Sequence, residues 1–348
     1  MPTPHEQLSD RERRVLEAVV QSYVETAEPV GSRNIARRFR LGVSAATVRN
    51  AMSDLEDRGL LSHPHTSAGR VPTDRAYRMY VDSLMSIARP TPEEEAAVRE
   101  ELTAEGSAIG AILRRAAQVL GVLTQELGVA VAPTLEDATL ERLELLSVSS
   151  ERLMLVLTLR SGLVRTIFVE VPGTIHPQAL ATVAAILNDR LAGCTLREIR
   201  QTVRERLRDT ARTPSEHELL DIFLATSEQI FEMPAPGVED VLLGRTSVLA
   251  EQPEFQSGQR MRELLSLTEQ RQDLRRVLGE RVRSMGITIT IGGENPEQRL
   301  SRLSVVTSPY RVGALSGVIG VIGPTRMPYE KIVALVEHTS RMVGDLLR

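Results

Sequence analysis

Three short helices in immediate succession are predicted for the first 60 residues, and no other feature restricts the fold of the chain as strongly. In the first segment, apolar residues recur at i, i+3, i+4 and i+7 from Leu16 to Tyr23, which gives one buried stripe. The break at Pro29–Ser32 precedes a second segment, whose inner face begins at Ile35. After a short turn, Ser44 is a suitable N-cap for a third helix. This order predicts a helix-turn-helix unit.

The third helix is predicted to have two faces of opposite character. Val48, Met52 and Leu55 repeat at i, i+4 and i+7 and form its core side. The outer face is then short, polar and cationic, and it consists of Ala46, Arg49, Asn50 and Ser53. An arginine can bond guanine O6 and N7, an asparagine can bond adenine N6 and N7, and a methyl group can lie against thymine. The third helix is therefore predicted to read bases in the major groove of DNA.

A short strand at Leu60–His63 and a loop of small polar residues follow the third helix. The loop reads Pro-His-Thr-Ser-Ala-Gly-Arg-Val-Pro-Thr from Pro64 to Thr73, and Arg70 supplies a cation near its end. This position predicts a wing that reaches backbone phosphate or the minor groove. The residues predicted to contact DNA are Arg33, Ser44, Ala46, Thr47, Arg49, Asn50, Ser53, His65, Thr66, Ser67 and Arg70. The alternative is a helical hairpin with ordinary surface arginines and an ordinary loop.

Charge adds little support for nucleic-acid binding. The net charge of the chain is −4, and residues 1–80 hold 12 arginines against 10 acidic residues, a balance of only +2. Because phosphate contacts require cations, two such regions side by side would be only modestly basic. The DNA-binding prediction therefore depends on the motif.

Several kinds of chemistry are excluded by composition. Lys331 is the only lysine among 42 basic residues and follows Glu330, so a phosphate-binding loop that ends in Gly-Lys cannot form. Cys194 is the only cysteine, which excludes an internal disulfide and a cysteine-based zinc site. Apart from His63 and His65, the histidines are scattered along the chain. We therefore expect no cofactor, no metal site and no enzymatic activity.

The length of 348 residues exceeds what a single core organises, so two or three domains are expected. No apolar run approaches the ~20 residues of a membrane span, and because the first residues are polar we expect no targeting segment among them. We expect a cytoplasmic protein that has no membrane partner.

An α+β fold is predicted beyond the break at Arg89–Glu95. Alternating apolar residues predict strands at 141–147, 152–159, 163–171, 287–291, 303–306 and 318–322. Residues 195–279 are charged and mostly helical in pattern. The simplest arrangement is one α+β domain that a helical segment interrupts.

Motifs along essentially the whole chain resemble the heat-inducible transcription repressor family HrcA. In the first domain they are Ala46–Met52, the string from Pro64 to Thr73, and Tyr77–Asp82. Farther along they are Gln252–Phe255, Ile289–Asn295 and Gly320–Tyr329. The wing string and Gly-Pro-Thr-Arg-Met are the most specific of these motifs.

The HrcA resemblance implies a winged-helix domain with a connecting helix at 1–90, a GAF-like domain at 91–205 and 280–348, and a mainly helical inserted dimerisation domain at 206–279. It further implies a homodimer that binds an inverted-repeat operator upstream of chaperone operons and is kept active by the GroE-type chaperonin. A regulator that senses a metabolite through the GAF-like domain is the alternative, and an enzyme with an appended DNA-binding domain is a third. Gly292–Asn295 would serve either as part of a ligand pocket or as a tight turn.

Overall fold

The structure is a computed structural model that describes residues 8–64, 69–104, 109–134, 138–160, 162, 164–171, 173, 176–208, 210, 213–232, 241–269, 271–282, 284–312 and 315–347. The chain divides into two compact units. The first comprises residues 1–131, 240–310 and 318–346, and the second comprises residues 132–239, 311–317 and 347–348. In the described residues, no helix is long and apolar enough to cross a membrane.

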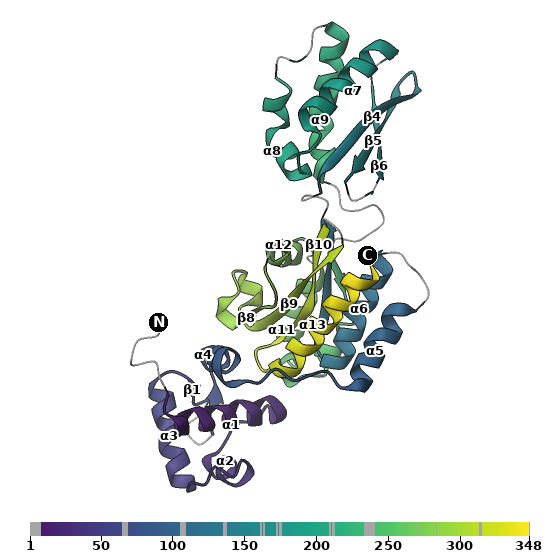
Figure 1. The fold of residues 1–348 in the computed structure, drawn as a ribbon. Helices are drawn as coiled ribbons and strands as arrows, with labels where there is room; N and C mark the ends of the chain where they lie inside the picture. The colour runs from purple at the N-terminus through teal and green to yellow at the C-terminus, as the bar shows by residue number, and fades with distance from the viewer. Residues whose placement is uncertain are drawn as a thin grey trace. The chain divides into compact units, whose positions relative to one another are not determined.

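A winged helix-turn-helix forms the start of the first unit (Figure 1). Its elements are α1 (Asp10–Thr26), α2 (Ser32–Arg38), α3 (Ala45–Asp57) and the antiparallel strands β1 (Leu61–Ser62) and β2 (Val71–Pro72). Leu16, Ile35 and Leu55 lie in its core with no exposed surface. Thr73 caps the connecting helix α4 (Asp74–Met79), which continues as the π-helical turn η2 (Tyr80–Leu84). The winged helix-turn-helix prediction is confirmed.

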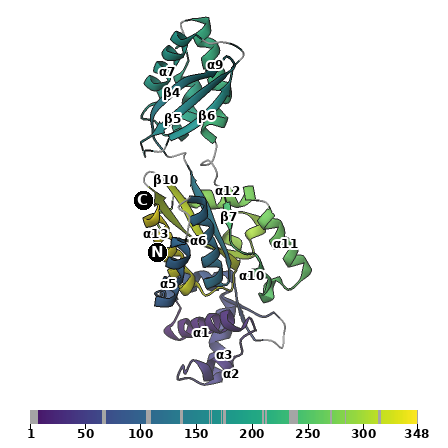
Figure 2. The same ribbon diagram turned by 90° about the vertical axis from the view of Figure 1, so that its right-hand side faces the viewer.

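The rest of the first unit is a core domain with helices on both faces of a five-stranded sheet (Figure 2). Its elements are α5 (Pro92–Thr103), α6 (Ile109–Thr124), β3 (Leu127–Thr134), β7 (Val241–Leu243), α10 (Ser247–Ala250), η4 (Pro253–Phe255), α11 (Gly258–Glu269), α12 (Arg271–Arg281), β8 (Thr288–Ile291), η5 (Gly292–Glu294), η6 (Gln298–Leu300), β9 (Leu303–Val312), β10 (Leu315–Pro324) and α13 (Tyr329–Leu346). The strand order is β7-β3-β10-β9-β8. Apolar residues of α11 and α12 join one face of the sheet in a single buried cluster, while α5, α6 and α13 pack together.

The second unit has its own sheet and core. It contains β4 (Leu140–Ser149), β5 (Arg152–Leu159), β6 (Val164–Glu170), α7 (Pro177–Leu191), α8 (Leu196–Arg206) and α9 (Pro214–Glu232). The three antiparallel strands lie in the order β4-β5-β6, and the helices cover one face of the sheet (Figure 1). Every buried residue of the cluster that joins them lies between Ala138 and Ile230.

The interrupting unit therefore differs from the predicted insertion at 206–279. Residues 132–205, which we assigned to the main domain, build most of the separate unit, whereas residues 240–279 pack α11 and α12 on the main sheet. Alternation along a strand tells which residues are buried, but it does not tell which core buries them. Helix α6 stops at Thr124, because Gln125 has a φ of 59° and β3 begins two residues later. The α+β class is confirmed. The likeness to GAF domains and the dimerisation role stay predictions.

Candidate nucleic-acid interface and its attachment to the core domain

Helix α3 presents the polar face that its sequence predicts. Val48 and Leu55 have no exposed surface and Met52 is buried, so the opposite side of the helix is free. The exposed residues on that side are Ala46, Arg49, Asn50 and Ser53. The helix therefore carries one cation and one amide at its surface, both of which can bond base edges.

The N-terminus of α3 is capped as predicted. The Ser44 hydroxyl accepts a hydrogen bond from the Thr47 amide at 3.1 Å, and the two side-chain hydroxyls lie 3.0 Å apart. A capped helix start directs its partial positive charge outward, which favours contact with a phosphate. Arg33 lies exposed in the first turn of α2. In the described part of the chain, neither Arg33 nor Arg49 forms an ion pair, so both cations are available to a ligand.

The wing begins and ends as an antiparallel pair, in which Leu61 lies opposite Pro72. The predicted contact residues His65, Thr66 and Ser67 lie outside the described residues. Arg70 does not point away from the domain. Its Nη2 atom lies 2.6 Å from Glu56 Oε2 on α3, its Nη1 atom contacts His63, and the side chain is only 18% exposed.

The backbone of Arg70 is equally well held. Arg70 and Val30 exchange two hydrogen bonds, of 2.8 and 2.9 Å, which tie the base of the wing to the connection between α1 and α2. A side chain on Gly69 would come within 2.4 Å of the Val30 carbonyl oxygen, so this approach requires glycine. In this geometry Arg70 holds the wing against α3, whereas the sequence predicted a phosphate contact.

The winged helix is attached to the core domain by charged residues at two points. On α4, the Arg78 guanidinium donates to both carboxylate oxygens of Glu294, at 2.8 and 2.5 Å, and to the Ile289 carbonyl at 2.7 Å. The second point is Arg326, which donates to both oxygens of Glu254, at 2.7 and 3.0 Å, and to the Val24 carbonyl of α1 at 2.7 Å.

Aromatic side chains fill the space near these ion pairs. The Tyr77 and Tyr329 rings are both buried, with centroids 6.0 Å apart, and the Tyr80 hydroxyl donates to Glu330. The Arg78 guanidinium, which bonds the Glu294 carboxylate, holds the pKa of that carboxyl below its ordinary value. Burial, followed by the bond to Glu330, raises the pKa of Tyr80 above its ordinary value, so this hydroxyl stays a donor at neutral pH.

Comparison with known proteins identifies the family. A model described as "Winged helix-turn-helix transcription repressor, HrcA DNA-binding" matches residues 7–84, and one described as "HrcA protein C terminal domain" matches residues 110–333. The chain belongs to the HrcA family. Proteins named "Heat-inducible transcription repressor HrcA" from Chlorobium limicola and Chlorobium phaeobacteroides are 39% and 41% identical to it, and each match covers 98% of both chains. A crystal structure of a hypothetical protein is 23% identical with a TM-score of 0.59, covers 98% of this chain and 99% of its own, and supports the fold.

The HrcA resemblance seen in the sequence is thus confirmed, and the chain is a transcription repressor with a DNA-binding winged helix. The HrcA relatives are named as regulators and not as enzymes. The distal motifs that resemble HrcA contain Glu254, Glu294 and Arg326, which sequence reasoning did not select. The available signal was that each is a charged residue in a motif with glycine or proline. The sequence does not reveal their partners, because Glu294 lies 216 residues from Arg78 and Arg326 lies 302 residues from Val24.

Replacing Arg70 by alanine should loosen the wing without removing a phosphate contact. The variant leaves the Glu56 carboxylate without its guanidinium partner, so we expect a loss of about 0.5–1 kcal/mol in unfolding free energy. DNA affinity should fall while the slope of its logarithm against the logarithm of salt concentration stays unchanged. Arg33→Ala is the matched control and should flatten that slope by about 0.9. If Arg70→Ala flattened the slope equally, as measured by fluorescence anisotropy, Arg70 would have to contact a phosphate.

A buried carboxyl lies beside the second attachment point. Glu126 is 2% exposed and accepts a hydrogen bond from Gln252 Nε2 at 3.1 Å. Burial raises its pKa well above the ordinary value, and the nearby Glu254 also raises it. A side chain on Gly323 would come within 2.0 Å of a Glu126 oxygen, so the carboxyl packs directly against this glycine. Ionisation of Glu126 is therefore less favourable in the folded protein than in the unfolded chain.

Glu126→Gln should stabilise the protein at neutral pH. The unfolded chain ionises Glu126 near its ordinary pKa, whereas the folded state resists ionisation, so the wild type loses stability as pH rises above that value. Glutamine avoids this loss, and we expect a gain of about 1 kcal/mol at pH 8 that shrinks towards pH 5. Urea unfolding at both pH values measures this gain in unfolding free energy. Glu100→Gln, at an exposed position, is the control. A gain that grew on acidification would contradict the assignment.

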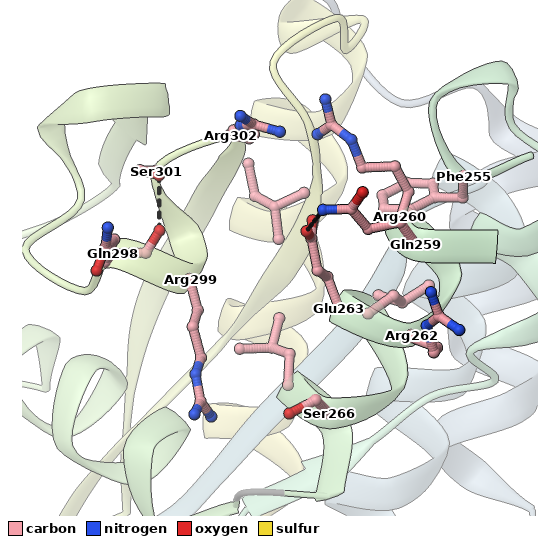
Figure 3. Close-up of a pocket in the computed structure, with 13 residues that line it drawn as sticks. Phe255, Gln259, Arg260, Arg262, Glu263, Ser266, Gln298, Arg299, Ser301 and Arg302 are labelled. Carbon is pink, nitrogen blue, oxygen red and sulfur yellow. Dashed lines mark hydrogen bonds between the residues drawn. The ribbon is translucent and has the colours of Figure 1, made fainter. Parts of the chain in front are cut away.

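A cationic cavity of about 550 Å³ lies elsewhere in the core domain (Figure 3). Arg260 and Arg262 reach it from α11, and Arg299 and Arg302 reach it from η6 and the residue before β9. Its floor is apolar and is made by Phe255, Leu264, Leu267 and Leu303, and Glu263 is the carboxylate that lines it. The segment Gly292–Asn295, for which the sequence left open a pocket or a tight turn, is not among the residues that line this cavity, and its Gly293 amide bonds Asp74 of α4. In the described residues, no group of three or more His, Cys, Asp or Glu side chains is placed to hold a metal ion.

Proposed function

We propose that the chain represses chaperone operons in the cytoplasm by binding an inverted-repeat operator as a homodimer, and that the GroE-type chaperonin maintains its activity. The observation that carries the proposal is the exposed face of α3, on which Arg49 and Asn50 lie at the surface beside a capped helix start. Bases are read by side chains of this kind, and the helix start and Arg33 are suited to phosphate. The names of the HrcA relatives support the heat-inducible role.

Dimerisation is supported by the second unit. The face of its sheet away from the helices exposes large apolar side chains, between 45% and 59% of each, at Leu146, Val148, Val164 and Phe168. Leu146 and Phe168 both lie opposite Met154 of the central strand and so lie side by side across the sheet, whereas Val164 lies opposite Thr158, farther along the same face. We define Leu146, Val148, Val164 and Phe168 as the sheet patch. Exposed contiguous apolar surface marks an interaction site, and one winged helix reads too few base pairs to select a genomic site.

The chaperonin proposal is supported by the HrcA resemblance and by the same sheet patch. A chain with two compact units and an exposed apolar face can leave that face uncovered before its subunits meet, which favours capture by a folding machine. Chaperonin should then raise the fraction of protein that can bind DNA without altering the bases it protects.

Footprinting on the organism's own chaperonin promoter, with and without chaperonin, tests the proposal. We expect one protected inverted repeat whose occupancy rises with chaperonin and falls when an unfolded competitor protein is added. Full, stable occupancy by chaperonin-free protein that chaperonin leaves unchanged would refute the chaperonin role. Absence of any protected inverted repeat would refute the operator.

A second candidate function, that of a ligand-responsive regulator, is favoured by the cationic cavity. Four arginines and one glutamate around an apolar floor suit an anionic metabolite with an apolar portion. Native mass spectrometry of the purified protein tests it. A bound small anion that is lost in Arg260→Glu and alters operator affinity would support the sensor, whereas protein of the bare chain mass with unchanged affinity in the variant would refute it.

A further inference from the structure

The two attachment points hold different elements of the winged-helix domain. Arg326, in the segment between β10 and α13, binds the carbonyl of Val24 in the last turn of α1. Arg78, on the helix that follows the wing, binds the loop around Glu294. We call the Arg326–Glu254 pair the first latch and the Arg78–Glu294 pair the second latch. A body held at two separated points cannot rotate about either one alone.

The first latch completes the C-terminus of α1. The last turn of a helix leaves carbonyl groups without helical partners and carries partial negative charge, and the last turn of α1 contains no basic residue of its own. Arg326 supplies that cation from the core domain, and its bidentate pair with Glu254 fixes the plane of the guanidinium. The side chains of Arg326 and Glu254 are 13% and 30% exposed, so the pair is partly shielded from solvent.

The second latch depends on a close backbone approach. Gly292 has a φ of 53°, and a side chain there would lie 1.9 Å from a carboxylate oxygen of Asp74, at the start of α4. The Gly293 amide donates to the same carboxylate at 3.1 Å. Asn295 supports the loop from behind, because its side-chain amide donates to three backbone carbonyls at 2.7 to 3.0 Å. The loop is therefore held by bonds within the core domain as well as by its contact with α4.

We propose that Arg78, Glu294, Arg326 and Glu254 are positioning residues that fix the orientation of α3 relative to the core domain, and so set the spacing between the recognition helices of a dimer. Helix α1 packs directly against α3, so a fixed α1 fixes α3. None of the four residues lies on the exposed face of α3. The inference rests on the proposed function, since spacing matters only when two subunits bind one operator.

Loosening the latches should weaken binding to an operator with two half-sites and leave the affinity for a single half-site unchanged. In a dimer, the second recognition helix binds at an effective concentration that depends on how rigidly it is held. A freely rotating winged helix lowers that concentration and tolerates other spacings. We expect about a 10-fold loss of affinity for the full operator, unchanged affinity for an isolated half-site, and a smaller penalty for a lengthened spacer.

The experiment compares the full-length double variant Glu254→Gln, Glu294→Gln with the wild type on these three DNAs. Glutamine keeps the shape of each side chain and removes the charge. Gly292→Ala opens the second latch by another route and should act in the same direction. Glu297→Gln is the control, because it breaks an exposed ion pair of 2.8 Å with Arg276 inside the core domain and should change nothing.

A second readout does not depend on DNA. Spin labels at exposed positions Asp57 and Glu337, in a Cys194→Ser background, report the distance between α3 and α13. The distance distribution should be narrow in the latched protein and broad in the double variant. A wild type with narrow distances that binds no operator would refute the proposed function and leave the latches supported as a rigid attachment.

Three outcomes would overturn the latches: equal distance distributions in wild type and double variant, equal loss on half-site and full operator, or full-operator affinity that is unchanged or increased. An equal loss would indicate damage inside the winged helix and not a change in its orientation.

Discussion

Arg49→Ala should abolish most of the preference of this protein for its operator over random DNA. Arg49 is exposed on the outer face of α3 and forms no ion pair in the described part of the chain, so its guanidinium is free to bond a guanine edge. One bidentate contact is worth ~1–3 kcal/mol of discrimination. A dimer loses it at two separated half-sites, which gives roughly 2–6 kcal/mol if the losses add.

Competition between operator and random DNA measures this ratio directly. The unfolding free energy of the variant should stay within about 0.5 kcal/mol of the wild type, because the side chain supports no packing. Arg33→Ala is the matched control and should weaken both DNAs nearly equally, since phosphate contacts carry no sequence information. A specificity ratio that survives Arg49→Ala would mean that α3 is not the recognition helix.

Local features of the winged helix were predictable because neighbours in sequence create them. The Ser44 cap and the buried positions Val48, Met52 and Leu55 follow from spacings of three and four residues, and the structure has them as expected.

Long-range features were not predictable in this way. The sequence shows Arg70 as a cation near the end of the wing. Its partner Glu56 lies on another element, and no spacing rule links the two residues. The insertion was misplaced because β4, β5 and β6 alternate as any half-buried strands do, while β3 continues across the insertion to β7, more than 100 residues later. Glu294 and Glu254 lie in motifs that resemble HrcA, but only the fold brings them to Arg78 and Arg326.

Excising the second unit should leave a folded protein that has lost dimerisation. Val131 of β3 lies opposite Val241 of β7 in an antiparallel pair, so the two strands can be joined where the insertion begins and ends. Replacing residues 132–240 by Asn-Gly supplies the two-residue turn that such a hairpin favours. The buried cluster of the core domain contains no residue between 132 and 240, so its core survives the excision.

The expected loss is large because it removes the link between two binding sites. Operator affinity should fall by roughly 10²–10⁴, while affinity for an isolated half-site stays unchanged. Phe168→Glu in the full chain tests the same surface without excision, since the charge enters the exposed sheet patch and leaves the opposite, buried face intact. Both variants should sediment as monomers at micromolar concentration, with exposed Glu170→Gln on the same strand as the control. If both variants remained dimeric and bound the operator at full strength, the subunits would have to meet through the first unit, and the sheet patch would need another partner.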